Sequence, residues 1–193
     1  MVQSSENDLE AIKQMSDLEK LRTVFRSWIG LLVQHCGLLI WPDEAGRAES
    51  DTRLYLLLAK GQNQTLAVSL GVGEDGQSPI VEYGTWQSEH SLNDLPRRII
   101  EWKNPAFWSQ HSSHRYESFS VENCDEFRGV IGFKIKSISV LVFEDERMDP
   151  TGIVLDLESG TRIWVVPGVC GTSVHSKLPN NWLTFRYKEV QVV

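Results

Sequence analysis

The sequence has few cysteines, and their spacing excludes two classes of protein. The three cysteines, Cys36, Cys124 and Cys170, stand far apart and form none of the close pairs typical of zinc sites. An odd number of distant cysteines also argues against a disulfide framework, which secreted domains use. We therefore expect three free thiols in a reducing compartment, with no metal and no cofactor.

The sequence also lacks membrane and secretion signals. Its most apolar stretch, residues 29–41, is interrupted by Gln34, His35 and Gly37, and it is shorter than the ~20 residues that span a bilayer. The first residues contain neither the basic region nor the apolar region of a secretory signal. These features predict a cytoplasmic protein with no membrane partner.

Basic residues are in the minority. The chain of 193 residues has 19 Lys and Arg against 26 Asp and Glu, which gives a net charge of -7 and a pI near 5.2. Nucleic-acid-binding domains usually have a pI above about 9, so we expect no direct binding to nucleic acid. The length suits a single domain covering residues 1–193.

The N-terminal part has a helical pattern. Residues 16–19 read Ser-Asp-Leu-Glu, which fits a capping box. Apolar residues then recur at steps of three and four from Leu18 to Leu32. We predict a helical segment at about 5–40, whose end is bracketed by Gly37 and Pro42 and which packs on the protein's own sheet. Alternatively, these apolar residues could form the interface of a dimer. The predicted oligomeric state is therefore a monomer or a weak homodimer.

The rest of the chain alternates with the period of strands. We predict strands at about 52–86, a short helix at about 94–103, and further strands at about 130–193. Both faces of the segment 54–58 are apolar, which is typical of a central strand. The order of elements lacks regular βαβ units. It therefore predicts an α+β fold with an N-terminal helix, a mostly antiparallel β-meander sheet and one further short helix.

One hairpin can be predicted in register. A three-residue turn at residues 158–160, with Gly160 left-handed, pairs Leu155 with Ile163 and sets Asp156 opposite Arg162 on the other face. Further upstream, the apolar phase slips by one residue near Ser137, which predicts either a β-bulge or a strand buried on both faces.

Motifs for catalysis or ligand binding are weak. Residues 71–76 match the dinucleotide pattern G-x-G-x-x-G, but a strand follows where a helix is needed, so we interpret them as a loop. His111 and His114 could bind a metal only if the fold brought His90 or Cys124 close to them, so we interpret them as surface or loop histidines. Cys170, close to His175, is the best candidate for a nucleophile. This pair defines the alternative function, a small enzyme or ligand-binding domain whose site is assembled only in the fold.

Acidic residues cluster in connecting segments, where they could form a surface for a basic partner. Trp108, at the end of an element, is a candidate anchor for such a partner. The predicted partner-binding residues are Trp108, Glu122, Asp125, Glu126, Glu144, Asp145, Glu146 and Asp149.

The hairpin at residues 152–165, together with the acidic, aromatic-rich composition, resembles bacterial polymorphic-toxin immunity proteins. This resemblance implies a non-enzymatic protein that binds a cognate toxin and occludes its active site. An acidic surface would suit the basic cleft of a toxin that attacks nucleic acids or nucleotides.

Overall fold

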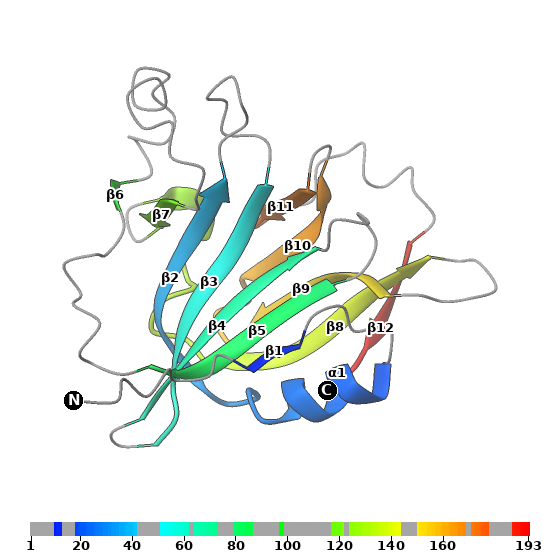
Figure 1. Ribbon diagram of the computed structural model, residues 1–193. Helices are drawn as coiled ribbons and strands as arrows, with labels where there is room; N and C mark the ends of the chain where they lie inside the picture. Colours follow the sequence, from blue (N-terminus) through cyan, green and yellow to red (C-terminus); the bar gives the residue numbers. More distant parts are fainter. Residues whose placement is uncertain are drawn as a thin grey trace, which may run out of the picture.

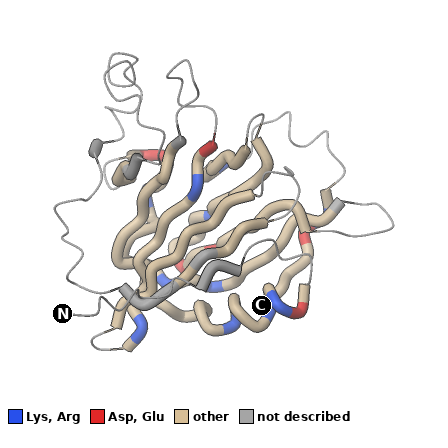
Figure 2. Tube along the Cα trace, in the orientation of Figure 1, with Lys and Arg blue, Asp and Glu red and all other residues tan. Residues whose placement is uncertain are grey.

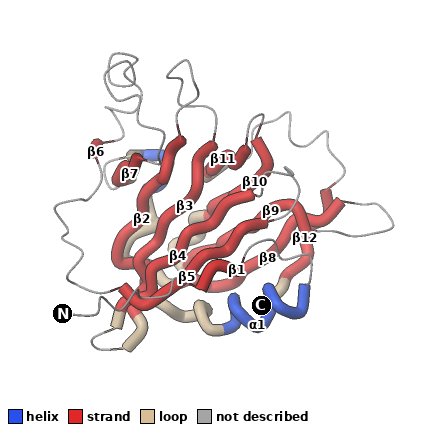
Figure 3. Tube along the Cα trace, viewed as in Figure 1, coloured by secondary structure: helices blue, strands red, loops and turns tan. Residues whose placement is uncertain are grey.

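The computed structural model describes most of the predicted strands and part of the predicted helix. It describes residues 10–12, 18–41, 51–61, 64–72, 79–86, 97–98, 117–121, 124–143, 150–168, 171–177 and 187–193. Within these ranges the chain forms two β-sheets and one α-helix (Figures 1 and 3).

The first sheet has seven strands in the order β1-β5-β4-β3-β2-β7-β6. Its pairs are antiparallel, except that β6 runs parallel to β7. The strands are β1 (Glu10–Ile12), β2 (Leu32–Trp41), β3 (Asp51–Ala59), β4 (Thr65–Val72), β5 (Pro79–Trp86), β6 (Arg97–Arg98) and β7 (Glu117–Ser120).

The second sheet has five strands, is antiparallel throughout, and has the order β11-β10-β9-β8-β12. Its strands are β8 (Ile135–Phe143), β9 (Pro150–Leu157), β10 (Arg162–Gly168), β11 (Gly171–His175) and β12 (Tyr187–Gln191).

One hydrophobic core joins the two sheets. Alternate residues of β3, such as Leu54 and Leu56, share a buried cluster with alternate residues of β9, such as Ile153 and Leu155. The sheets also meet at a corner, where Leu32 forms a bridge to Lys134. Burial of apolar surface in this shared core is the main driving force for the fold.

A second link ties β11 to the first sheet. The Thr172 amide donates to Asp51 Oδ1 at 2.9 Å, and the Val72 amide donates to Thr172 Oγ1 at 2.7 Å. These bonds link β11 to the ends of β3 and β4, and the residues they join are 100 and 121 positions apart in sequence.

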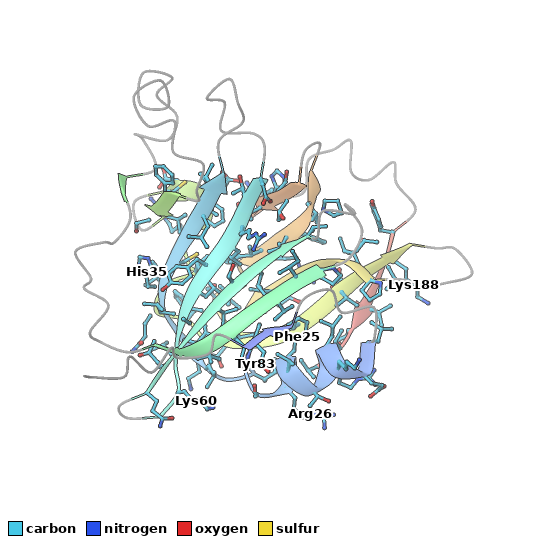
Figure 4. The ribbon with its side chains drawn as sticks, viewed as in Figure 1. Phe25, Arg26, His35, Lys60, Tyr83 and Lys188 are labelled. Atoms are coloured by element: carbon cyan, nitrogen blue, oxygen red, sulfur yellow. The ribbon has the colours of Figure 1, made fainter. Side chains whose placement is uncertain are left out.

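Helix α1 (Leu18–Arg26) packs against this core with Leu21 and Phe25, which are fully buried. Trp28, just after the helix, lies 5.0 Å from Phe25 and 6.1 Å from Tyr83 of β5, measured between ring centroids. Figure 4 shows Phe25 and Tyr83 between the helix and the first sheet. Among the described residues, no helix has the length and apolar character needed to cross a membrane.

The predicted helical segment at 5–40 is wrong over most of its described length. The helix is limited to Leu18–Arg26, whereas Glu10–Ile12 and Leu32–Trp41 are strands. Gly30, with a φ of 78°, separates α1 from β2, and Gly37 lies inside β2 rather than after a helix. Leu32 fits both the helical spacing that starts at Leu18 and the first position of β2. The spacing of apolar residues therefore does not show where the helix ends and the strand begins.

The class prediction is confirmed in its coarse form, since the described chain is mostly antiparallel strands with one α-helix. Two sheets replace the single meander that we expected. The strands at 52–86 are confirmed, with β3 in the interior of its sheet. Most of the predicted helix at 94–103 lies outside the described residues, and the two described there, Arg97 and Arg98, form a strand instead.

Candidate interaction surface on the five-stranded sheet

The β9–β10 hairpin has the predicted register. Leu155 pairs with Ile163 and Asp156 pairs with Arg162, while Gly160 adopts a φ of 84° in the turn. Leu155 and Ile163 are fully buried in the core. Asp156 and Arg162 therefore lie on the opposite side of the sheet, which we call the outer face.

Arg162 binds two carboxylates from different strands on this outer face. Its Nε and Nη2 donate to the two carboxylate oxygens of Asp156 at 2.6 and 3.1 Å. Its Nη1 and Nη2 also donate to Glu189 of β12 at 3.1 and 3.2 Å. Since β9 and β8 separate β10 from β12, the Arg162–Glu189 ion pair passes over the outer face of both strands.

Apolar residues lie on the same face. Leu141, Val154 and Val166 form a small buried cluster, separate from the main core, and the partly buried Trp164 and Tyr187 pack against it. The Arg162 guanidinium carbon lies 5.0 Å from the centre of the Trp164 ring, within the range of a cation–π contact. We call Asp156, Arg162, Trp164 and Glu189 the Arg162 group.

The charges of the Arg162 group stabilise one another. The hydrogen bonds from Arg162 hold the pKa of Asp156 below its ordinary value, despite the opposing effect of burial. The hydrogen bond to Asp156 in turn raises the pKa of Arg162. Ser137 Oγ also donates to Asp156 Oδ2 at 3.1 Å, from the point where β8 has the predicted bulge, since its register shifts between Ile135 and Ser137. The positive charge of Lys136 also lowers the pKa of Asp156, so two basic side chains accompany the two carboxylates here.

The pKa of Asp156 leads to a prediction about acid stability. Because the folded-state pKa lies below the ordinary value of 3.8, the ionised carboxylate stabilises the fold above that value, and this contribution is lost as the pH falls through the folded-state pKa. The pair is partly exposed, so we expect a contribution below about 1 kcal/mol. Urea unfolding of the wild type and of Asp156→Asn at pH 7 and pH 3 should show a smaller acid-induced loss in the variant.

Arg162→Gln is the matched control for this prediction, because it removes the main cause of the lowered pKa. It should also reduce the acid-induced loss, but by less than Asp156→Asn does, since Ser137 and Lys136 still lower the pKa of Asp156. An equal pH dependence in the wild type and both variants would contradict the role assigned to this pair.

A 3₁₀ turn, η2 (Asp125–Phe127), adjoins the hairpin turn. Ser159 Oγ donates to the Gly129 carbonyl at 2.5 Å, and Thr161 Oγ1 donates to the Arg128 carbonyl at 3.0 Å. These bonds connect the chain just after η2 to the β9–β10 turn, so both turns form one surface.

His175 links this surface to the Arg162 group. It pairs in register with Trp164, which places both residues on the outer face. Burial lowers the pKa of His175, and the negative charge of Glu126 in η2 acts in the opposite direction. A neutral imidazole therefore predominates at pH 7.

Two of the predicted partner-binding residues can be placed. Asp125 and Glu126 are exposed in η2, and Asp125 pairs with Arg128 at 2.5 Å. Acidic and basic positions are mixed along the described trace, as Figure 2 shows. The predicted residues outside the described part of the chain are Trp108, Glu122, Glu144, Asp145, Glu146 and Asp149.

The alternative site can be placed only in part. His175 is described, whereas Cys170 lies outside the described residues. Cys36 is fully buried, and burial raises the pKa of its thiol, which keeps it protonated. Within the described ranges, no three His, Cys, Asp or Glu side chains group closely enough to hold a metal ion.

Two residues of the Arg162 group, Trp164 and Glu189, were not predicted from the sequence. The alternation along β10 could have identified Trp164, because it shares a face with Arg162. No local signal identifies Glu189, since its role depends on β12 lying beside β8. No family model, curated protein or solved structure matches this chain.

Proposed function

We propose that this protein is a non-enzymatic binding protein, and specifically an immunity protein that neutralises a cognate bacterial toxin. In this proposal the partner is a basic protein, and the outer face and η2 contact it so that the toxin's active site is occluded. The resemblance and the acidic composition suggest the toxin as the partner.

The main support for the proposal is that Trp164 and Arg162 lie next to each other on the outer face of the five-stranded sheet. Tryptophan, tyrosine and arginine are the residues that most often dominate protein–protein binding energy. Arg162 is held by two carboxylates on β9 and β12, which limits the side-chain entropy lost on binding. The adjacent acids Asp125 and Glu126 would favour approach by a basic partner through long-range attraction.

Affinity capture followed by an activity assay tests this function. The immobilised protein should retain a basic protein from the native lysate of its source cells, and raised salt should release it. The captured protein should show a toxic activity that stoichiometric addition of this chain abolishes. A captured protein whose activity is unaffected by saturating addition would contradict the inhibitor function.

The acidic residues of η2 lead to a kinetic prediction. Glu126→Lys should slow association with the captured partner by about two- to fivefold at low salt, because electrostatic attraction raises the association rate. The rate should also become less dependent on salt. Surface plasmon resonance at several salt concentrations measures both effects.

Glu19→Lys is the matched control, because Glu19 is an exposed glutamate on α1, which belongs neither to η2 nor to the five-stranded sheet. It makes the same change in net charge. Equal effects of Glu126→Lys and Glu19→Lys would show that net charge alone matters and would remove η2 from the proposed interface.

A further inference from the structure

The pairing of β3 with β4 stops before either strand ends. Leu54 and Leu70 form the last pair of this ladder, although β3 begins at Asp51 and β4 continues to Val72. The same register, extended by two residues, would pair Thr52 with Val72. The ends of the two strands therefore remain outside the ladder that joins the rest of them.

Thr172 of β11 takes the position of the missing pair. The Val72 amide donates to Thr172 Oγ1 at 2.7 Å, and Thr172 Oγ1 donates to the Val72 carbonyl at 3.5 Å. A residue of β3 paired with Val72 would bond the same amide and the same carbonyl. The Thr172 hydroxyl thus replaces one residue of a neighbouring strand, and Thr172 is only 2% exposed.

Two neighbours keep Thr172 in this position. Asp51 Oδ1 accepts a hydrogen bond from the Thr172 amide at 2.9 Å. Gly71 leaves room for the hydroxyl, because a Cβ atom at this position would lie 3.1 Å from Thr172 Oγ1. Figure 1 shows β11 beside the end of β3. The sheets are therefore joined here by a few side-chain bonds and not by a continuous ladder.

We propose that Thr172 is a reversible clasp between the two sheets, and that the fold has a second state in which the clasp is released. In that state β3 and β4 pair as far as Thr52 and Val72. The change replaces the bonds between Val72 and Thr172 by bonds between Val72 and Thr52, so the Val72 amide has a partner in both states. Among the described strands, β10 alone then pairs with β11, and this end of the core opens.

This inference goes beyond the proposed function, because it does not depend on what the outer face binds. Its test is hydrogen exchange in Thr172→Val, which removes the hydroxyl. The amide of residue 172 should exchange at least about tenfold faster, because Asp51 no longer holds it. The Val72 amide should keep its protection, since it donates to the Thr52 carbonyl instead. A nuclear Overhauser contact between the backbones of Thr52 and Val72 should appear.

Thr151→Val is the matched control, since Thr151 is fully buried and its hydroxyl donates to the Leu141 carbonyl within the five-stranded sheet. It should leave both amides unchanged, and Thr172→Ser, which keeps the hydroxyl, should exchange as the wild type does. Gly71→Ala displaces the hydroxyl by steric contact and should act like Thr172→Val, which preserves the test if the latter does not fold. Loss of Val72 protection in both variants would show a purely structural bond and overturn the second state. Undiminished protection of residue 172 would overturn the clasp.

Discussion

Replacing Trp28 by alanine is expected to lower the free energy of unfolding by about 3–5 kcal/mol, the usual range for removing a large aromatic side chain from a core. Trp28 is 1% exposed and lies between Phe25 and Tyr83. Its removal leaves a cavity between α1 and the first sheet. Urea unfolding followed by circular dichroism measures the loss.

Ile29→Ala provides the control, because Ile29 is the next residue in the chain and is 36% exposed. It should cost much less than Trp28→Ala, about 1 kcal/mol, since Ile29 is a smaller side chain and more than a third of the residue stays exposed in the folded state. Similar losses in both variants would contradict the packing of Trp28 against the core.

Replacing Gly37 by alanine is expected to cost about 1–3 kcal/mol, as for other substitutions that overfill a packed site. Gly37 pairs with Tyr55 of β3 and with Ser120 of β7. A Cβ atom at this position would lie 2.8 Å from the Phe119 carbonyl oxygen. Because this oxygen belongs to the backbone of β7, the β7 backbone near Phe119 must shift, and the pairing of β2 with β7 should be weakened there.

Hydrogen exchange separates this local effect from general destabilisation. In Gly37→Ala, the amides of residues 117–120 should exchange faster relative to those of β9. Gly30→Ala is the control, because no atom lies within 4 Å of its added Cβ and its cost comes from a φ of 78°. Unchanged protection of residues 117–120 in Gly37→Ala would contradict the steric argument.

The sequence specified local pairings better than the boundaries between elements. The turn at Gly160 and the register of Asp156 with Arg162 were predictable because turn chemistry and alternation agree there. The end of α1 was not, because Trp28 and Leu32 continue the helical spacing into a turn and a strand. Both the helical period and the strand period fit these residues, and tertiary packing determines which structure forms.

Only the part of the candidate site that lies within one hairpin could be predicted from the sequence. One hairpin contributes Asp156, Arg162 and Trp164, and its alternation places them on one face. Glu189 joins them because β12 pairs with β8, a contact between strands more than 40 residues apart. The spacing of residues along the chain does not predict such long-range strand pairing.

The hydrogen bond from Thr172 to Asp51 also bears on aggregation. Strand β11 is an edge of the five-stranded sheet, and exposed edge amides can add a strand from another molecule. The Asp51 carboxylate occupies the Thr172 amide and would repel an incoming carbonyl. At the opposite edge, β12 carries the exposed Lys188 (Figure 4), a residue type that discourages edge-to-edge association. Each edge of this sheet thus carries a feature that opposes the addition of a strand.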